Sequence, residues 1–229
     1  MKTWTLLSGL AALVVLVAAP SFSRRPTPPL RAALKSTEPS SKTYTDNRDH
    51  RTYQTVQIGT QEWFAENFAY LPSVGTAGVF VYGYEGNSVS QAKMTESYQK
   101  YGALYTWEQA IKLAPTEWRL PSDADWQRLE KQIGIDPKDV DTMGWRGKNR
   151  EADSLKAGGS SGFKVLFGGW RTDQGTSNFQ GEHANFWVAD SYDAGRAYER
   201  LINYKNGSIG RDVGQKGCGF SVRYVREAR

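Results

Sequence analysis

The sequence predicts a mixed α+β domain in which strands lie at both ends and helices lie between them. Three observations support this order. Apolar and polar residues alternate near both ends of the domain, two helical segments between 106 and 134 have capping residues, and the Asn206-Gly207 dipeptide is typical of a β-hairpin. The 229 residues include 39% apolar residues and eight tryptophans, which exclude disorder of the whole chain. No segment repeats at a fixed period, so a repeat architecture is not expected.

The first 43 residues precede this domain. Residues 1–23 are typical of a secretory signal peptide, because Lys2 precedes the apolar run 6–17 and small residues follow it. That run is too short for a comfortable membrane span, although an uncleaved N-terminal anchor is the alternative. Residues 24–43 contain four prolines and are predicted to be an extended linker. We therefore expect an exported mature chain without a transmembrane segment, in the periplasm, at the cell surface or outside the cell.

The net charge of +5 lies in this N-terminal segment. Once Lys2 and the linker, with its five basic and one acidic side chains, are set aside, residues 44–229 carry 23 basic and 23 acidic side chains. A nucleic-acid-binding domain needs a clustered basic face. The domain is therefore not expected to bind nucleic acid. The linker is interpreted as a solvated spacer, with contact to an anionic cell surface as the alternative.

Strands are predicted at each end of the domain. Residues 52–59 alternate in the manner of a half-buried strand, and residues 61–68 are the expected hairpin partner. Near the C-terminus, residues 197–204 and 208–212 flank the Asn-Gly turn. Residues 220–225 alternate again and are predicted to form the final strand.

Two helices are predicted between these strands. The first covers residues 106–114, where a threonine and a glutamine have the spacing of a capping box and a proline ends the helix. The second begins after Ser122, a preferred N-cap residue, and ends near Gly134, a preferred C-terminal stop. Nine glycines between 144 and 181 then predict long loops with little regular structure.

Five sequence strings occur in order along the domain. They are Asp49-x-x-x-Tyr53-x-Thr55-Val56-x-Ile58-Gly59-x-Gln61-x-Trp63-x-Ala65-Glu66-Asn67; Tyr105-x-Trp107-x-x-Ala110; Trp118-Arg119-Leu120-Pro121-Ser122 with Trp126; Gly168-Gly169-Trp170-Arg171 with Phe186-Trp187; and Gly219-Phe220-Ser221-Val222-Arg223. Together they resemble the Fibrobacter succinogenes major paralogous domain family over roughly residues 44–227. One such string would be weak evidence, whereas five in order make the resemblance specific.

The motif residues are interpreted as structural. Pro121 forces an extended residue before it and Ser122 caps the following helix, which fits a joint better than a ligand loop. Glu66 and Asn67 are expected to tie loops to backbone groups, with a sugar-binding polar pair as the alternative. The other structural motif residues are Trp63, Trp107, Trp118, Arg119, Trp126, Trp170, Trp187, Phe220 and Arg223.

The resemblance implies a C-type-lectin-like α+β fold, with two helices, small antiparallel sheets, long irregular loops and neighbouring termini. It also implies exported or surface proteins without an established reaction. Members commonly carry cysteines at the positions of Ala114 and Tyr224, and their joint absence here is expected if those cysteines normally pair. The domain then lacks a covalent closure that is typically worth about 2–4 kcal/mol. Packing of Tyr224 is expected to compensate in part.

The cysteine and histidine counts exclude several kinds of site. The chain has a single cysteine, Cys218, which excludes an intramolecular disulfide and a four-cysteine zinc site. The chain therefore also lacks the second cysteine that formylglycine-generating oxidases need. Cys218 is interpreted as an inert, partly buried thiol, with a reactive exposed thiol as the alternative. Two histidines leave little for a histidine-based metal centre. No catalytic residue and no cofactor is predicted. Calcium binding is unsupported, because the lectin strings Glu-Pro-Asn, Gln-Pro-Asp and Trp-Asn-Asp do not occur.

Candidate ligand-facing residues flank the long loop region. Residues 170–173 and 182–185 combine aromatic rings, a guanidinium, carboxylates and an amide, a mixture that suits carbohydrate or peptide binding. The candidates are Arg171, Asp173, Glu182 and Asn185. By fold analogy, the favoured function is non-catalytic recognition of a glycan or an envelope protein by loops on a rigid frame. A hydrolase that uses loop carboxylates, or a structural subunit of an envelope assembly, are the alternatives.

Overall fold

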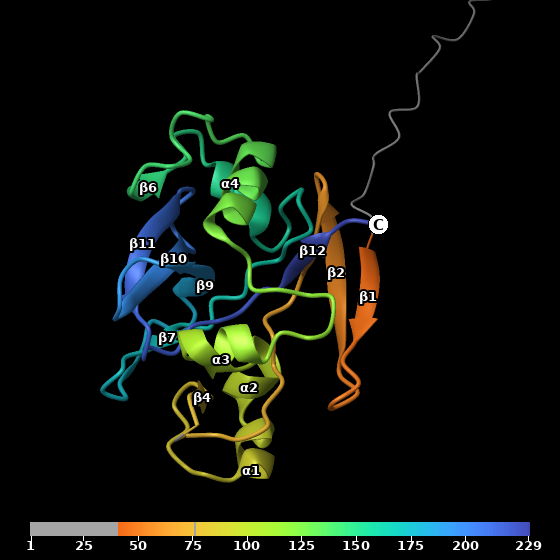
Figure 1. Cartoon of the computed structure of the whole chain (residues 1–229), viewed down its shortest axis with the longest axis vertical. Coiled ribbons are helices and arrows are strands. Elements are labelled where there is room, and N and C mark those ends of the chain that lie inside the picture. The colour runs from red at the N-terminus through yellow and green to blue at the C-terminus, as the bar shows by residue number, and fades with distance from the viewer. Residues whose placement is uncertain (1–40, 76) are drawn as a thin grey trace, which may run out of the picture. The chain divides into compact units, whose positions relative to one another are not determined.

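The computed structural model describes residues 41–75 and 77–229 (Figure 1). The predicted signal peptide, 1–23, and the predicted linker up to residue 40 lie outside the described residues. The fold is mixed α+β, as the sequence predicts. In these ranges, four α-helices accompany two four-stranded sheets and two two-stranded ones. None of the described helices combines the length and the apolar character that a membrane span requires.

The first sheet contains both the first and the last strand of the described chain. Its order is β1 (Ser41–Thr45), β2 (Thr52–Ile58), β3 (Gln61–Phe64) and β12 (Val225–Glu227), with antiparallel pairs throughout (Figure 1). The predicted opening hairpin is confirmed, and Gly59 turns the chain at a φ of 60° that favours glycine. The predicted linker boundary is corrected, because residues 41–43 pair with β2. They follow the last proline of the linker, so their backbone N–H groups are free to join a sheet.

The second sheet has the order β6 (Gly144–Arg146), β11 (Ile209–Gln215), β10 (Arg196–Asn203) and β9 (His183–Ser191), again with antiparallel pairs. The predicted Asn-Gly hairpin joins β10 to β11, confirming the strand pair at this end of the domain. Successive side chains of β9 point to opposite faces, as in any strand. Phe186 packs into one apolar cluster and Trp187 into another, so both faces of this sheet have apolar contacts.

Both predicted helices are present. The first is α3 (Trp107–Lys112), where the Thr106 side chain accepts a hydrogen bond from the backbone of the first turn. The second is α4 (Asp123–Gln132), where Ser122 and Asp125 form a reciprocal capping box. Local capping chemistry therefore fixes where both helices begin.

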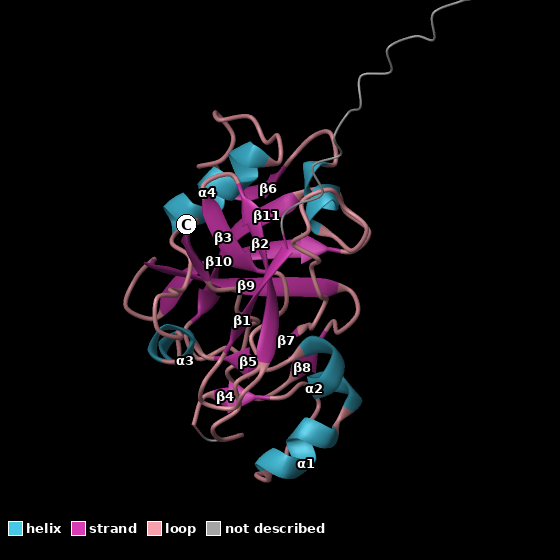
Figure 2. Ribbon diagram, turned by 90° about the vertical axis from the view of Figure 1, so that its right-hand side faces the viewer, coloured by secondary structure: helices cyan, strands magenta, loops and turns pink. Residues whose placement is uncertain are grey.

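The prediction of only two helices is wrong, because the described ranges also contain α1 (Val89–Met94) and α2 (Glu96–Tyr101). These helices lie beside β4 (Val79–Phe80) in both views (Figures 1 and 2). Each has six residues and buries only one side chain, so neither presents the apolar stripe by which a helix is identified in a sequence. Their side-chain caps, Ser88 and Thr95, were the only local signal.

The glycine-rich region between 144 and 181 contains only short elements. They are β6, a 3-10 helix at Glu151–Leu155, and a hairpin of β7 (Trp170–Arg171) and β8 (Ser177–Asn178). The fourth, two-stranded sheet pairs β4 with β5 (Leu104–Tyr105). The prediction of long stretches with little regular structure is therefore confirmed for this region.

The predicted final strand over 220–225 is wrong in extent. Only Val225–Glu227 forms β12, while residues 220 and 221 make isolated bridges to other segments. Every residue from 220 to 225 is buried, so the alternation does not mark a solvent-facing side. Its polar members, Ser221 and Arg223, make hydrogen bonds inside the protein.

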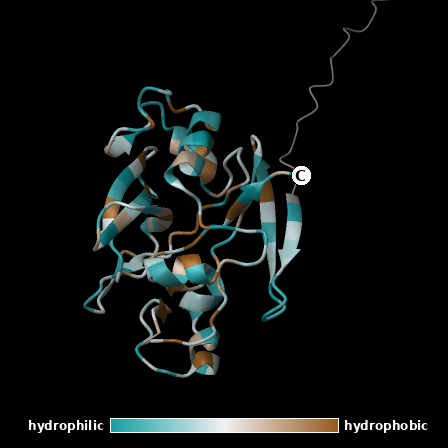
Figure 3. Ribbon diagram, viewed as in Figure 1, coloured by the Kyte–Doolittle hydropathy of each residue, from teal (hydrophilic) through white to brown (hydrophobic). Residues whose placement is uncertain are grey.

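Two apolar cores pack against opposite faces of β3. Core A contains Phe64 and core B contains Trp63, which are neighbours in the strand and point to opposite faces. Figure 3 shows the matching alternation of polar and apolar bands along β2. The largest fully buried side chains of core A are Tyr53, Phe64, Phe68, Tyr105, Trp187 and Tyr224, and those of core B are Trp63, Trp126, Phe163 and Phe186.

Tyr224 joins the C-terminal segment to α3 without a covalent bond. Its ring is buried in core A, and its hydroxyl donates to the backbone carbonyl oxygen of Ala110 at 2.8 Å. Ala114, one turn beyond Ala110, packs against the same core. The position that commonly carries a cysteine in the resembled family thus supplies a non-covalent link between the same two segments.

Replacing Tyr224 with phenylalanine is expected to lower the free energy of unfolding by about 1–3 kcal/mol, because the buried Ala110 carbonyl loses its hydroxyl donor. Urea unfolding of the wild type and the variant measures the difference. Tyr192→Phe is the matched control, since that ring is 50% exposed and its change should lie within about 0.5 kcal/mol of the wild type. Equal values for the two variants would show that the buried hydroxyl contributes nothing.

Candidate functional site

The predicted ligand-facing residues contact separate segments of the chain. The Arg171 guanidinium, on β7, lies 4.3 Å from the centre of the Phe80 ring. Asp173 is exposed in the turn between β7 and β8. Glu182 is exposed just before β9, and its backbone carbonyl accepts a hydrogen bond from the backbone N–H of Tyr204. Asp173 and Glu182 therefore lie at the surface, whereas the Arg171 side chain is only 17% exposed and lies 3.6 Å from a carboxylate oxygen of Glu85.

Asn185 lies inside the protein. Only 3% of the residue is exposed, and its Nδ2 donates to Glu199 Oε2 at 2.8 Å across the β9–β10 pair. It is therefore not presented to an external ligand in this structure. The ligand-binding role of the four sequence candidates stays a prediction.

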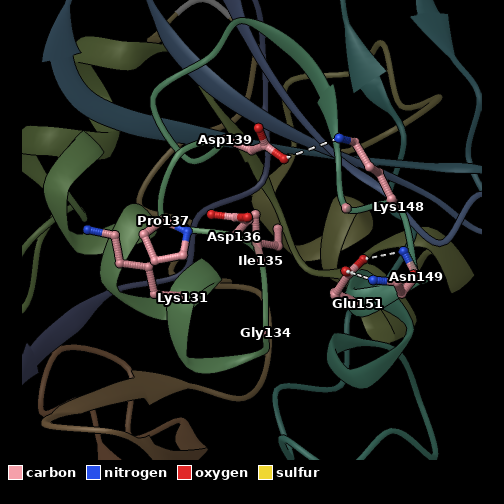
Figure 4. Close-up of a pocket in the computed structure, with 10 residues that line it drawn as sticks. Lys131, Gly134, Ile135, Asp136, Pro137, Asp139, Lys148, Asn149 and Glu151 are labelled. Carbon is pink, nitrogen blue, oxygen red and sulfur yellow. Dashed lines mark hydrogen bonds and ion pairs between the residues drawn. The ribbon is translucent and has the colours of Figure 1, made fainter.

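A hollow lies between the C-terminal end of α4 and the segment that follows β6 (Figure 4). It encloses about 520 Å³, and its rim and floor are mainly charged or polar, so we call it the polar cleft. Its lining residues are Lys131, Gly134, Ile135, Asp136, Pro137, Asp139, Gly147, Lys148, Asn149 and Glu151. Two segments, residues 131–139 and 147–151, thus form its two walls.

Two glycines shape this cleft. Gly134 has a φ of 103° and turns the chain sharply after α4. Gly147 has a φ of 95°, and a Cβ atom added there would lie 2.8 Å from a carboxylate oxygen of Glu151. A side chain at either position would be strained, so the glycines allow the two walls to take this course.

The carboxylates of the polar cleft already face donors or an ammonium group (Figure 4). Glu151 accepts hydrogen bonds from the backbone N and the Nδ2 of Asn149, at 3.0 and 3.2 Å. Asp139 lies 3.8 Å from the Lys148 ammonium group. Asp136 accepts the backbone N–H two residues further along the chain, and this bond lowers the pKa of its carboxyl. The cleft therefore presents ionised acceptors beside ammonium and amide donors.

A second hollow, of about 570 Å³, lies between α3 and the N-terminal end of α4. Its floor is apolar, with Ile111 and Trp118 among the lining residues, and its polar groups already bond to one another. Asp125 accepts hydrogen bonds from the side chains of Arg119, Arg128 and Ser122 and is itself buried. These contacts tie the segment before α4 to the helix and leave few free polar groups for a ligand.

Most motif residues are interior. Trp63, Asn67, Trp118, Pro121, Trp126, Trp187, Phe220 and Arg223 are buried, Glu66, Trp107, Ser122 and Trp170 are half-buried, and Arg119 is exposed. Asn67 illustrates their contacts, because its Nδ2 donates to the Tyr101 carbonyl and to Ser221 Oγ while its Oδ1 accepts from Arg223. Both ends of this amide are thus used within the protein.

No group of three or more His, Cys, Asp or Glu side chains in the described ranges is arranged to hold a metal ion. Cys218 is buried, and burial raises the pKa of its thiol, which disfavours the nucleophilic thiolate. Glu199, which the sequence did not single out, is buried as well, and desolvation raises the pKa of its carboxyl to about 7.

A family profile described as the Fibrobacter succinogenes major domain matches residues 56–226. The chain belongs to this family. No curated protein and no solved structure gives a match. The matched residues include part of the first sheet, the whole second sheet, the four described α-helices and the polar cleft.

Sequence reasoning missed the polar cleft of this family member. Its walls, residues 131–139 and 147–151, contain charged side chains that look like ordinary solvated loops when read along the chain. The two glycines, Gly134 and Gly147, were the only local signals, and they indicate turns without indicating a site. The cleft arises because the two segments meet in space, which no local pattern shows.

Proposed function

We propose that the protein is an exported recognition protein that binds glycans at the cell envelope, that it does not catalyse a reaction, and that the polar cleft is its binding site. The observation that carries this proposal is the cleft itself. It gathers two ammonium groups, three carboxylates and an amide around about 520 Å³, within the range of about 300–1,000 Å³ typical of ligand sites. Export is supported by the signal-like sequence of residues 1–23.

We also propose a C-type-lectin-like frame for the domain. Its support is the pairing of the first and last strands in one sheet, together with the short elements between 144 and 181. In such a frame, loops vary in sequence without loss of the core, which suits recognition. The second wall of the polar cleft, residues 147–151, comes from this loop region.

A glycan fits the polar cleft better than a protein ligand does. Sugar hydroxyl groups both donate and accept hydrogen bonds, and the cleft offers acceptors on Asp136 and Asp139 beside donors on Lys131 and Lys148. Centres of protein–protein interfaces are instead depleted of charged residues and enriched in aromatic ones. The lining of the cleft has the opposite composition.

Binding also fits the cleft better than hydrolysis. A glycosidase needs a carboxylic acid with a raised pKa that protonates the leaving oxygen. The pKa of Asp136 is lowered by its backbone hydrogen bond, and both oxygens of Glu151 accept hydrogen bonds from Asn149. The cleft carboxylates are therefore arranged as acceptors.

We expect the purified chain to bind a glycan in a screen of glycans and polysaccharides, and we expect this binding to depend on the polar cleft. Asp139→Ala and Asn149→Ala should each weaken binding about tenfold or more, because each removes a hydrogen-bonding group beside charged neighbours. Titration calorimetry with the best glycan measures the loss. Chelator should leave the affinity unchanged, since no described group of side chains is suited to a metal.

Arg171→Ala and Glu182→Ala serve as matched controls, because neither residue lines the polar cleft. Loss of binding in these two variants, with the cleft variants unaffected, would move the site to the region that the sequence predicted. No binding to any glycan in the panel would refute the proposed function, and a pull-down from envelope extract would then test protein partners.

A further inference from the structure

Glu199 and Asn185 form a buried polar pair between β10 and β9. They are 6% and 3% exposed, and Asn185 Nδ2 donates to Glu199 Oε2 at 2.8 Å. The other half of the amide is unexplained, because Asn185 Oδ1 is buried and has no hydrogen-bond partner. Burying a hydrogen-bond acceptor without a donor costs free energy, so a neighbouring group is expected to donate a hydrogen bond to Asn185 Oδ1.

No cation accompanies this carboxyl. Within the described ranges, no ion pair involves Glu199. The nearest arginines along the strands, Arg200 and Arg211, belong to another network, in which they pair with Asp123 and, for Arg200, with Glu130. An ionised Glu199 would therefore be a buried charge without a counter-ion, which proteins avoid.

The remaining neighbours of Glu199 also oppose its ionisation. Asp212 lies opposite Glu199 in the β10–β11 register, and its negative charge disfavours a second one. Trp187 lies opposite Glu199 on β9 and contributes an apolar ring. The thiol of Cys218 is also close enough to be affected by the charge of Glu199, and it carries no positive charge.

We propose that Glu199 is a neutral carboxylic acid in the folded protein and that its O–H donates a hydrogen bond to Asn185 Oδ1. The two side chains then form a mutual acid–amide pair that joins β9 to β10, and this pair loosens when the acid ionises. In this pair the amide N–H donates to one carboxyl oxygen and the carboxyl O–H donates to the amide oxygen. Ionisation releases the proton to solvent and leaves Asn185 Oδ1 without a donor. The second sheet thereby becomes sensitive to pH near neutrality.

The direction of the pH effect follows from proton linkage. Burial raises the pKa of Glu199 from 4.5 to about 7, so between these values the folded protein keeps a proton that the unfolded chain has lost. Stability from this group is complete below pH 4.5, falls as pH rises through the folded pKa, and is constant above it. Asp123 and Asp125 each bond to arginines that lower the pKa of their carboxyls, so their contribution to folding stability is lost only at more acidic pH.

The test compares the full chain with Glu199→Gln, which keeps both hydrogen bonds but has no titratable proton. The ratio of the wild-type unfolding constant to that of the variant should rise about 200-fold between pH 4 and pH 8, as the two pKa values require. Urea unfolding at a series of pH values measures this ratio. A ratio independent of pH would overturn the proposal.

Two further measurements keep the proposal testable if Glu199→Gln folds poorly. Infrared spectra of the wild type at pH 6 should contain the carbonyl band of a buried protonated carboxyl that disappears above pH 8, and its absence at pH 6 would overturn the proposal. Asp212→Asn removes the like charge from an exposed position, so the midpoint of the pH transition should move to lower pH. A midpoint moved to higher pH would contradict the assignment.

Discussion

Replacing Glu130 with glutamine is expected to lower the free energy of unfolding by about 3–5 kcal/mol, because two buried guanidinium groups lose their counter-charge. Arg146 Nη1 lies 2.6 Å from one carboxylate oxygen of Glu130, and Arg200 Nε lies 2.6 Å from the other. The three side chains are at most 1% exposed, so water cannot replace the missing charge. Urea unfolding of the wild type and the variant measures the difference.

The size of this effect reflects the network to which Glu130 belongs. Arg200 also pairs with Asp123, which pairs in turn with Arg211, at 2.7 and 2.9 Å. These contacts connect α4 to β6, β10 and β11, so two carboxylates on the helix, Glu130 and Asp123, hold the second sheet in place. Three arginines face Glu130 and Asp123, and a third carboxylate, the exposed Asp141, lies 3.4 Å from Arg211, so removing Glu130 leaves an excess of positive charge.

Glu227→Gln is the matched control for Glu130→Gln. Glu227 also contacts two arginines, at 3.1 Å from Arg119 and 3.0 Å from Arg128, but its side chain is 59% exposed. Its loss should cost less than about 1 kcal/mol, as for other surface ion pairs. Similar losses in the two variants would contradict the argument that burial sets the cost. Replacing Glu130, Arg146 and Arg200 together with apolar residues should cost less than Glu130→Gln alone, since no buried charge is then left unpaired.

The predictable part of the fold is the part that depends on local chemistry. Ser122 with Asp125 three residues later specifies the start of α4, and Asn206-Gly207 specifies the turn between β10 and β11. By contrast, α1 and α2 are held by packing at one buried residue each, which leaves no periodic pattern in their sequences. Tertiary contacts, and not intrinsic helix propensity, determine whether such short helices form.

The interior polar contacts were beyond local reasoning because their partners are remote in sequence. Glu130 is 16 residues from Arg146 and 70 from Arg200, and no pattern within a window of one element connects them. The alternation of residues 220–225 misled for the same reason. It predicts a strand over all six residues, whereas most of them are held by contacts with other segments and every one of them is buried. The polar cleft likewise requires knowing that the segment after α4 meets the segment after β6.

Replacing Arg223 with methionine is expected to lower the free energy of unfolding by about 4 kcal/mol, because several buried acceptors lose their donors at once. Arg223 is fully buried. Its Nε donates to Asn67 Oδ1 at 2.8 Å, and its Nη1 donates to the Phe64 and Phe163 carbonyl oxygens at 3.0 and 2.7 Å. Its Nη2 donates to the Lys164 carbonyl oxygen at 3.0 Å. Chemical denaturation at pH 7 measures the loss.

The setting of Arg223 explains why a lysine should not replace it. Its guanidinium faces neutral acceptors and lies 4.8 Å from the centre of the Phe163 ring. Burial lowers its pKa to about 9, which still leaves it cationic at neutral pH. A planar fork reaches acceptors in several directions, whereas the compact ammonium group of lysine cannot reach all four. Arg223→Lys is therefore expected to lose most of the stability that Arg223→Met loses.

Arg196→Met separates the effect of burial from the effect of removing any arginine. Arg196 also stacks on an aromatic ring, 4.9 Å from the centre of Tyr192, and pairs with Asp193, but its side chain is 44% exposed. Its replacement should cost less than about 1 kcal/mol. Arg223→Met and Arg196→Met could instead lower the free energy of unfolding equally. The buried carbonyl oxygens would then have found other donors, and Arg223 would not be the group that joins the C-terminal segment to both cores. If Arg223→Lys kept full stability, charge alone would explain the site, and the directional hydrogen bonds of the guanidinium would not.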